Sequence, residues 1–269
     1  MTDKSISALE RFQQLQKREK SIGVWESCES TFRIQENQNA VGALLIHGFG
    51  ASPYEMKVLG EHLFKEGFNV YSARLSGHAT NVKDFAGSGM ASWLSSAEEA
   101  YDIIAETSSS TFIIGQSLGA AIALLLGPKV NPAGIVALSC ILKFMDRKIK
   151  LTSYSVLRFL FPYKKMNVHP ADIGYIYEKR PTIVISELLK VCKSLVKGLP
   201  NQKSPLLLMQ AEDDPVIDPK SVEILFNEAG SKVKEILKFK EGGHRLTLMP
   251  EPDRDLLFRK IVSFINAHS

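Results

Sequence analysis

The chain has 269 residues, of which 45% are hydrophobic, and a formal net charge of +4. A chain of this size can bury one sizeable core, and no Gly/Ser/Pro-rich linker divides it into independent domains. The small net charge and the lack of a basic motif interleaved with aromatic residues argue against a nucleic-acid partner. The three cysteines have no metal-binding spacing, which is typical of a reduced, cytoplasmic protein.

The N-terminal segment has a weak helical pattern. Residues 1–20 carry polar and charged side chains throughout, so this segment predicts neither a signal peptide nor a membrane anchor. Its apolar residues recur every three positions, and their stripe therefore drifts around a helix of period 3.6: Ile6, Leu9, Phe12 and Leu15. We expect a loosely packed surface helix here, although docking on the body of the protein or on a second subunit stays open.

Apolar runs alternate with helical patterns along the rest of the chain. This alternation predicts an α/β fold with a mostly parallel, doubly wound sheet that helices cover on both faces. The runs place strands near residues 43–47, 69–73, 111–115, 135–139, 206–210 and 235–239. A last helix over residues 254–267 carries one apolar stripe, so we expect it to pack against the sheet.

A glycine-rich loop follows the first of these strands, in His47-Gly48-Phe49-Gly50. The next helix is expected to begin at Ser52-Pro53-Tyr54-Glu55, which has the spacing of a capping box with proline at the first helical position. Such a loop can hold one backbone N–H rigidly. We predict that the amide of Phe49 is a donor to the oxyanion of an acyl-transfer reaction.

The segment Gly115-Gln116-Ser117-Leu118-Gly119 lies between an apolar run and a helix-forming run that begins at Ala120. A strand that leads directly into a helix forces a sharp turn, which lifts the Ser117 hydroxyl clear of the backbone, and the flanking glycines relieve crowding. This context predicts a nucleophile elbow rather than an ordinary turn. The amide of Leu118 then becomes the second oxyanion donor.

More residues separate the predicted strands 135–139 and 206–210 than one crossover helix requires. We therefore predict a helical cap insertion over residues 141–203, which leaves residues 1–140 and 204–269 as the two parts of the core. Most large apolar residues of a cap must pack within it. Four are assigned to substrate binding: Phe144, Met145, Leu160 and Phe161.

Basic residues lie among these apolar ones in the predicted cap: Arg147, Lys148, Lys150, Arg158, Lys164 and Lys165. This mixture is compatible with contact to an anionic membrane surface. We favour the simpler interpretation, in which the basic residues form a solvated edge of the cap.

A serine nucleophile requires a base and a group that orients the base. The segment Ala211-Glu212-Asp213-Asp214-Pro215 follows one predicted strand, and Glu241-Gly242-Gly243-His244 follows the next. Because the carboxyl ends of parallel strands share one edge, Ser117, Asp214 and His244 can meet there. Physical arguments alone do not decide between Asp213 and Asp214. Asp218, before Pro219, is instead expected to cap the following helix.

The other histidines have weaker claims to the role of base. His62 and His268 lie on helical segments, and His169 lies in the predicted cap. His47 and His78 follow strands beside a glycine, where a side chain that hydrogen-bonds to the backbone is expected. We therefore assign the general base to His244.

Together these motifs resemble those of an α/β-hydrolase of the carboxylesterase and monoacylglycerol-lipase group. The resemblance rests on the motifs at residues 47–50, 115–119 and 243–244, on Asp214, and on Arg74-Leu75-Ser76-Gly77-His78, and it covers the chain from about residue 40 onwards. It implies Asp214 as the orienting acid, Phe49 as an oxyanion donor, and neither a metal nor an organic cofactor. Related sequences often carry glycine where this chain has Ala79.

The sequence thus predicts a serine hydrolase that cleaves small-molecule carboxylic esters of short to medium acyl chains through an acyl-enzyme. A thioesterase with the same chemistry is one alternative. The other is a non-catalytic or very slow receptor of the same fold, which binds a small apolar ligand under the cap. The sequence leaves the physiological substrate and the oligomeric state open.

Overall fold

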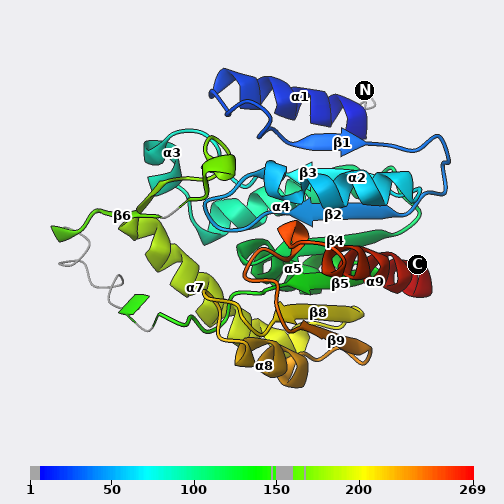
Figure 1. Cartoon of the computed structure of the whole chain (residues 1–269). Coiled ribbons are helices and arrows are strands. Elements are labelled where there is room, and N and C mark those ends of the chain that lie inside the picture. Colours follow the sequence, from blue (N-terminus) through cyan, green and yellow to red (C-terminus); the bar gives the residue numbers. More distant parts are fainter. Residues whose placement is uncertain (1–6, 147, 150–159, 167) are drawn as a thin grey trace.

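A seven-stranded sheet forms the centre of the protein in the computed structural model, which describes residues 7–146, 148–149, 160–166 and 168–269. The strand order is β1-β3-β2-β4-β5-β8-β9, and only the edge strand β1 is antiparallel to its neighbour (Figure 1). The strands are β1 (Thr31–Arg33), β2 (Gly42–Ile46), β3 (Asn69–Ala73), β4 (Thr111–Gln116), β5 (Gly134–Leu138), β8 (Leu206–Ala211) and β9 (Lys234–Phe239).

The six strands that the apolar runs predicted are all present, and each bound lies within one residue of its prediction. The α/β-hydrolase fold is thereby confirmed, with a mostly parallel sheet and helices on both faces. Strand β1 escaped prediction because it has three residues and lies at the edge, where none of its side chains is fully buried.

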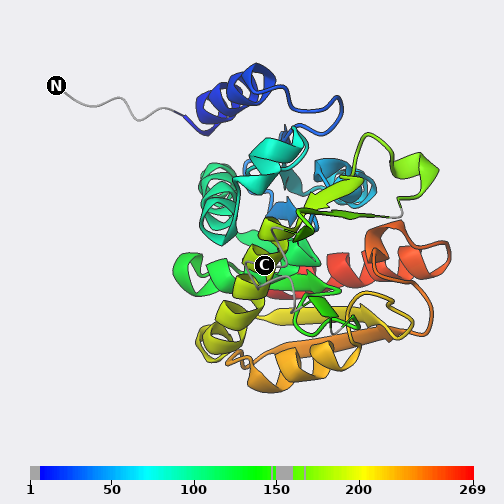
Figure 2. The same cartoon turned by 90° about the vertical axis from the view of Figure 1, so that its left-hand side faces the viewer.

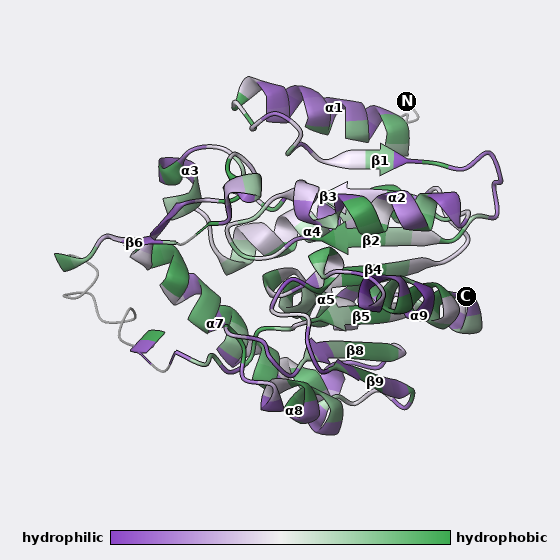
Figure 3. Cartoon of the chain, viewed as in Figure 1, coloured by the Kyte–Doolittle hydropathy of each residue, from purple (hydrophilic) through white to green (hydrophobic). Residues whose placement is uncertain are grey.

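Helices cover the sheet on both faces and complete two apolar clusters. One cluster receives side chains from α4 (Met90–Ala105), α5 (Leu118–Val130), α7 (Thr182–Gly198) and α8 (Lys220–Glu228), and the other from α2 (Lys57–Lys65) and α9 (Asp253–His268). Strands β2, β4, β5 and β8 are buried along their whole length, and Figure 3 shows them as mainly hydrophobic. The predicted stripe on the last helix is confirmed by buried Leu257, Ile261 and Ile265.

The N-terminal helix α1 (Ala8–Ser21) docks on the body of the protein beside β1 and α4 (Figures 1 and 2). Ser7 and Glu10 form a capping box at its start. Its buried residues are Ala8, Phe12, Leu15 and Glu19, whereas Leu9 is 52% exposed. The prediction of a loosely packed helix is therefore wrong, because the buried face follows spacings of three and four rather than a constant three. Ile6 lies outside the described residues.

In the described part of the segment between β5 and β8, the strand β6 (Tyr163–Lys165) and the start of α7 lie past the carboxyl ends of the parallel strands, on the left of Figure 1. This part contains an antiparallel pair, β6 and β7 (Lys179–Pro181), which the sequence did not predict. Helix α7 follows and packs on α5 and α4 of the core. The division into a core and a cap at residues 141–203 stays a prediction.

The short helices α3 (Val82–Ala86), η1 (Pro53–Met56), η3 (Pro170–Asp172), η4 (Leu199–Asn201) and η5 (Leu246–Leu248) complete the described structure. Within the described residues, every helix is too short or too polar to cross a membrane.

Candidate active site

Ser117 lies at the turn between β4 and α5, with a φ of 56° and a ψ of −108°. This turn brings two glycines against neighbouring backbone. A Cβ at Gly115 would lie 2.2 Å from the carbonyl carbon of Gly119, and a Cβ at Gly119 would lie 2.1 Å from the Ile46 oxygen. Only glycine fits at either position, so the strained elbow and its two glycines depend on each other.

Two hydrogen bonds connect Ser117, His244 and Asp214 across three loops. The Nε2 atom of His244 lies 2.9 Å from Ser117 Oγ, and its Nδ1 atom lies 2.8 Å from Asp214 Oδ2. The three residues follow β4, β8 and β9, whose carboxyl ends lie at the same edge of the sheet. The structure thus brings together the three side chains that the sequence selected.

The surroundings of Asp214 distinguish it from Asp213. Asp214 is buried, and its Oδ1 atom accepts hydrogen bonds from the amides of Val216 at 2.8 Å and Ile217 at 3.0 Å. Its Oδ2 atom also accepts from Gln210 Nε2 at 2.8 Å. Asp213 is exposed and instead accepts from the amide of Gly243 at 2.8 Å. Asp214 therefore contacts the imidazole, while Asp213 holds the loop that carries it.

The loop after β2 packs directly against the elbow. A Cβ at Gly48 would lie 3.4 Å from Ser117 Cβ, and the side chain of Phe49 lies over Phe85 with 5.2 Å between ring centroids. Leu118 is the first residue of α5. The amides of Phe49 and Leu118 thus belong to the two segments that meet at the Ser117 side chain, and their role as oxyanion donors stays a proposal.

Glu55 has a different role from the predicted capping box. The Ser52 side chain makes no cap hydrogen bond, and the Glu55 carboxylate reaches back to accept the amide of Gly48 at 2.6 Å. Burial raises the pKa of Glu55, while the nearby charges of Arg245, His244 and Arg180 act in the opposite direction. The spacing correctly predicted an acidic residue near the start of the helix, but it did not predict that this residue bonds the Gly48 amide.

Gln116 and Gln210 also support the site, and the sequence analysis missed both. Gln116 Nε2 donates to the carbonyl of His244 at 2.8 Å, and Gln210 donates to Asp214. Gln116 is the last residue of β4 and Gln210 is the next-to-last residue of β8, and both strands are buried. A polar residue at the end of an apolar run is the feature of the sequence that could have identified them. A buried amide at that place requires partners, and here the partners belong to the loops of the site.

A cavity of roughly 390 Å³ opens above Ser117 and His244. Phe49 and Phe144 line it, together with aliphatic side chains of Ile141, Ile185 and Leu188. Of the four residues assigned to substrate binding, only Phe144 lies at this cavity. The others are more than half exposed and are absent from its described lining: Met145, Leu160 and Phe161.

The remaining histidines are occupied elsewhere, as the sequence analysis expected. His62 packs on Phe258, and His268 packs on Phe264. His169 is exposed at the rim of the cavity, where its Nδ1 atom accepts the amide of Ala171.

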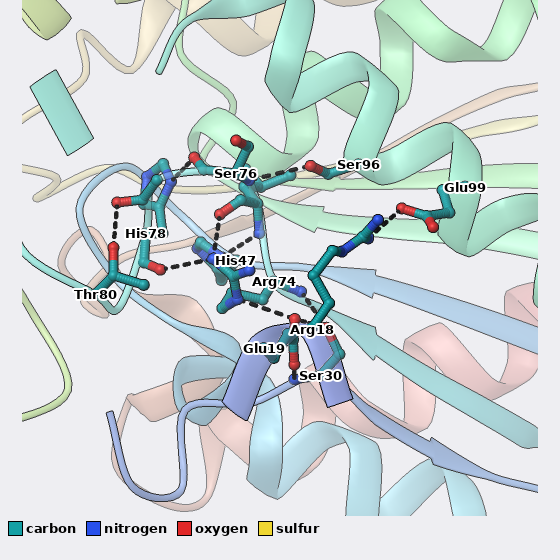
Figure 4. A network of polar contacts seen from close by, with 12 residues as sticks. Arg18, Glu19, Ser30, His47, Arg74, Ser76, His78, Thr80, Ser96 and Glu99 are labelled. Carbon is teal, nitrogen blue, oxygen red and sulfur yellow. Dashed lines mark hydrogen bonds and ion pairs between the residues drawn. The ribbon is translucent and has the colours of Figure 1, made fainter. Parts of the chain in front are cut away.

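His47 and His78 belong to a buried polar network beneath the site (Figure 4). His47 Nδ1 donates to the Gly48 carbonyl, and its Nε2 atom accepts the amide of Leu75 at 3.1 Å. The ring of His78 lies 5.0 Å from that of His47. This pattern requires the neutral form of His47, and burial accordingly lowers the pKa of His47 to about 4.

The same network reaches the N-terminal helix through a buried ion pair between Arg74 and Glu19 (Figure 4). The Arg74 Nε atom donates to Glu19 Oε1 at 2.9 Å, and its Nη1 atom donates to the carbonyl of His78. Glu19 also accepts two hydrogen bonds from Ser30 at 2.8 Å. Helix α1 therefore supplies the acid that neutralises the arginine of the 74–78 motif.

Replacing Glu19 with alanine is expected to lower the free energy of unfolding by about 3–5 kcal/mol, because it leaves a buried arginine without its partner. Urea unfolding measures this change. The matched control is Glu99→Ala, which breaks the exposed pair with Arg18 and is expected to cost less than about 1 kcal/mol. Equal losses of stability in the two variants would show that the buried pair stabilises the fold no more than the exposed pair does.

The buried histidines also predict a pH dependence of stability. The pKa of His47 falls from 6.5 to about 4 and that of His78 falls well below 6.5, so the unfolded chain binds protons first. As the pH drops from 6.5 towards 4, each ring should lower the free energy of unfolding by up to about 1.4 kcal/mol per pH unit. Glu55, whose pKa burial raises, contributes in the opposite sense.

Urea titrations between pH 4.5 and 7.5 test this dependence. His47→Gln should flatten the slope of stability against pH, whereas His169→Gln, which alters an exposed ring, should leave the slope as in the wild type. If His47→Gln leaves the wild-type slope unchanged, the pH dependence of stability does not come from His47.

Of the six basic residues assigned to the cap edge, three are described and are exposed: Lys148, Lys164 and Lys165. Arg147, Lys150 and Arg158 lie outside the described residues. Lys164 approaches Asp146 at 3.7 Å, and both side chains are about half exposed. Contact with a membrane surface stays untested.

Ala79 adopts the left-handed backbone conformation, with a φ of 55°. It is fully buried, and its carbonyl accepts the amide of Trp25. A positive φ favours glycine, which is the residue that the family resemblance led us to expect at this position. In this chain an alanine adopts the conformation.

The chain is similar in sequence and fold to known lipases and esterases. The chain is 28% identical over 231 residues to a thermostable monoacylglycerol lipase of Bacillus sp. (strain H-257), covering 85% of this chain and 92% of the relative. It is 26% identical over 227 residues to a carboxylesterase of Bacillus subtilis (strain 168), covering 82% and 91%. A metagenome-derived lipolytic enzyme has the same fold, with a TM-score of 0.83 and 24% identity over 91% of this chain and all of that one.

The family model described as "Serine aminopeptidase, S33" matches residues 37–253. The match spans the loop after β2, the elbow and the loops that carry Asp214 and His244. The chain therefore belongs to this family of α/β-hydrolases, Hydrolase_4.

Proposed function

We propose that the protein hydrolyses carboxylic esters, with Ser117 as nucleophile, His244 as general base and Asp214 as the acid that orients it. The observation that carries this proposal is the unbroken row of hydrogen bonds from Ser117 Oγ through His244 to Asp214. A serine hydroxyl is a weak nucleophile unless an adjacent base takes its proton. The strained turn at Ser117 and the buried Asp214 supply the rigid placement that this chemistry requires.

The reaction proceeds in two halves. His244 removes the Ser117 proton as the hydroxyl oxygen attacks the ester carbonyl, and the amides of Phe49 and Leu118 stabilise the oxyanion. His244 then protonates the departing alcohol, which leaves the acyl group on Ser117. In the second half His244 activates water, which releases the carboxylic acid and restores the serine.

The substrates that we propose are small esters of short to medium acyl chains. The cavity above Ser117 has a volume within the range of small-molecule sites, and Phe49, Phe144 and Ile141 offer apolar surface to an acyl chain. The names of the two curated relatives, a monoacylglycerol lipase and a carboxylesterase, support the same class. The three cysteines are free and buried, and we propose a reducing, cytoplasmic setting.

The test is steady-state hydrolysis of p-nitrophenyl esters and monoacylglycerols of increasing acyl length, with matched thioesters in parallel. We expect saturable rates with many turnovers per chain. A fluorophosphonate should label the protein once, and peptide mapping should place the label on Ser117. Tight binding of these ligands without turnover would favour a receptor of the same fold, and faster cleavage of the thioesters would favour a thioesterase.

A further inference from the structure

Arg180 of β7 lines the cavity above Ser117. Its Cζ atom lies 5.3 Å from the centroid of the Phe49 ring, and a Cβ at Gly50 would lie 2.7 Å from its Nε atom. The neighbouring Tyr177 amide donates to the Gly50 carbonyl at 2.8 Å. The segment from Tyr177 to Arg180 therefore lies directly on the loop that carries Phe49.

The Nε–H group of Arg180 is buried, and it has no hydrogen-bond partner in the described part of the chain. A buried N–H without an acceptor is unfavourable, and more so when it belongs to a charged group. Burial also lowers the pKa of Arg180 to about 10, and the charge of Arg245 adds to that effect. The geometry leaves a partly buried cation at the cavity, and its Nε–H donor is unpaired within the described residues.

The other charged groups at the cavity have partners. Arg245 donates to Asp172 at 2.5 Å, and Lys164 approaches Asp146 at 3.7 Å. The remaining acid is Glu55, which favours the charged form of Arg180 electrostatically but uses Oε2 to accept the Gly48 amide. Arg180 is thus the cavity cation that lacks a direct ion pair among the described residues.

We propose that Arg180 binds an anionic oxygen group, a carboxylate or a phosphate, on the ester substrate; this inference rests on the proposed ester hydrolysis. A guanidinium has five donors in a planar fork and no acceptor, so its natural ligand is a pair of anionic oxygens. The apolar lining then receives the chain between that anion and the ester carbonyl. The substrate class is an ester with a second, negatively charged end.

The negatively charged end can belong to the acyl part or to the alcohol part of the ester. An anion on the acyl part is tested with mono-p-nitrophenyl adipate and its neutral isostere, p-nitrophenyl 6-methylheptanoate. Adipate is chosen because the carboxylate of a shorter diacid closes a five- or six-membered ring and attacks its own ester. The measured quantity is the preference, defined as the kcat/KM for the anionic ester divided by that for the neutral ester. Arg180→Met should lower the preference by about ten- to a hundred-fold, since it removes hydrogen bonds to a charged group.

The alcohol side is tested with 1-butanoylglycerol and 1-butanoylglycerol 3-phosphate, with the same ratio as the readout. The matched control for both arms is Lys179→Met, which removes a positive charge from the preceding, exposed residue of β7 and should leave both preferences as in the wild type. Thermal unfolding of both variants shows whether either has lost its fold. The arm that loses its preference in Arg180→Met identifies the end of the substrate that carries the anion.

Binding provides a readout that does not require turnover. Monomethyl adipate should bind to Ser117→Ala protein more tightly than methyl 6-methylheptanoate does, and the added change Arg180→Met should remove that difference. If wild-type protein hydrolyses neutral esters but neither arm nor binding depends on Arg180, this inference is wrong and the proposed hydrolysis stands. If Arg180→Met lowers the rates for both members of each pair equally, Arg180 serves only to pack the Phe49 loop, and the inference is also wrong.

Discussion

Replacing Ser117 with alanine is expected to lower kcat for ester hydrolysis by about 10⁶-fold, because the acyl-enzyme cannot form without the hydroxyl oxygen. His244 and Asp214 would keep their places, but the base would have no serine proton to remove. Initial rates with p-nitrophenyl butanoate measure the effect. The variant should still bind ester substrates, since the described lining of the cavity is otherwise unaltered.

The matched control is Ser139→Ala, which removes another buried hydroxyl one residue after the end of β5. Ser139 Oγ has no hydrogen-bond partner within the described structure, and we expect that variant to retain most of the activity. A rate in Ser117→Ala close to that of the wild type would exclude Ser117 as the nucleophile.

Replacing Asp214 with asparagine is expected to lower kcat by about 10⁴-fold. The carboxylate at 2.8 Å from Nδ1 keeps a proton on that nitrogen, which leaves Nε2 free to accept the proton of Ser117. An amide can present its NH₂ group there instead and favour the opposite tautomer. It would also face the Gln210 amide, which donates to the same oxygen. KM should change much less than kcat.

Asp213→Asn is the control for Asp214→Asn, because it alters the adjacent carboxylate, which bonds the Gly243 amide and does not contact the imidazole. We expect its kcat to fall by no more than about tenfold, as for a residue that only holds a loop. Urea unfolding of both variants separates lost activity from lost stability. A larger fall for Asp213→Asn than for Asp214→Asn would reverse the assignment of the orienting acid.

The sequence predicted the central strands and the Ser117 turn because their signals are local. Buried parallel strands appear as continuous apolar runs, and the elbow requires glycines that no other residue can replace. The position of His244 at the same edge follows from strand topology, which the alternating pattern also predicts. The choice between Asp213 and Asp214 was beyond physical reasoning on the sequence, because it depends on which carboxylate the Val216 and Ile217 amides hold in place.

Long-range contacts account for what the sequence analysis missed. Glu55 stands at the right spacing for a capping box, but its carboxylate bonds Gly48 in the preceding loop. Arg180 belongs to a short strand pair more than a hundred residues after that loop, yet it lines the cavity. From the sequence alone, its charge would predict a residue at the protein surface. Leu160 and Phe161 show the converse, since apolar character in the sequence did not bring them to the cavity.

The ion pair between Glu19 and Arg74 bears on where the folding unit of this protein ends. The family match covers residues 37–253, yet Glu19 precedes it, and α9 extends from Asp253 to His268. A chain shortened to the matched residues would keep Ser117, Asp214 and His244 but would lose the counterion of a buried arginine and a helix that contributes Leu257 and Ile261 to the core. The family match therefore covers the residues of the chemistry, but we expect the chain to need further residues on both sides of it in order to fold on its own.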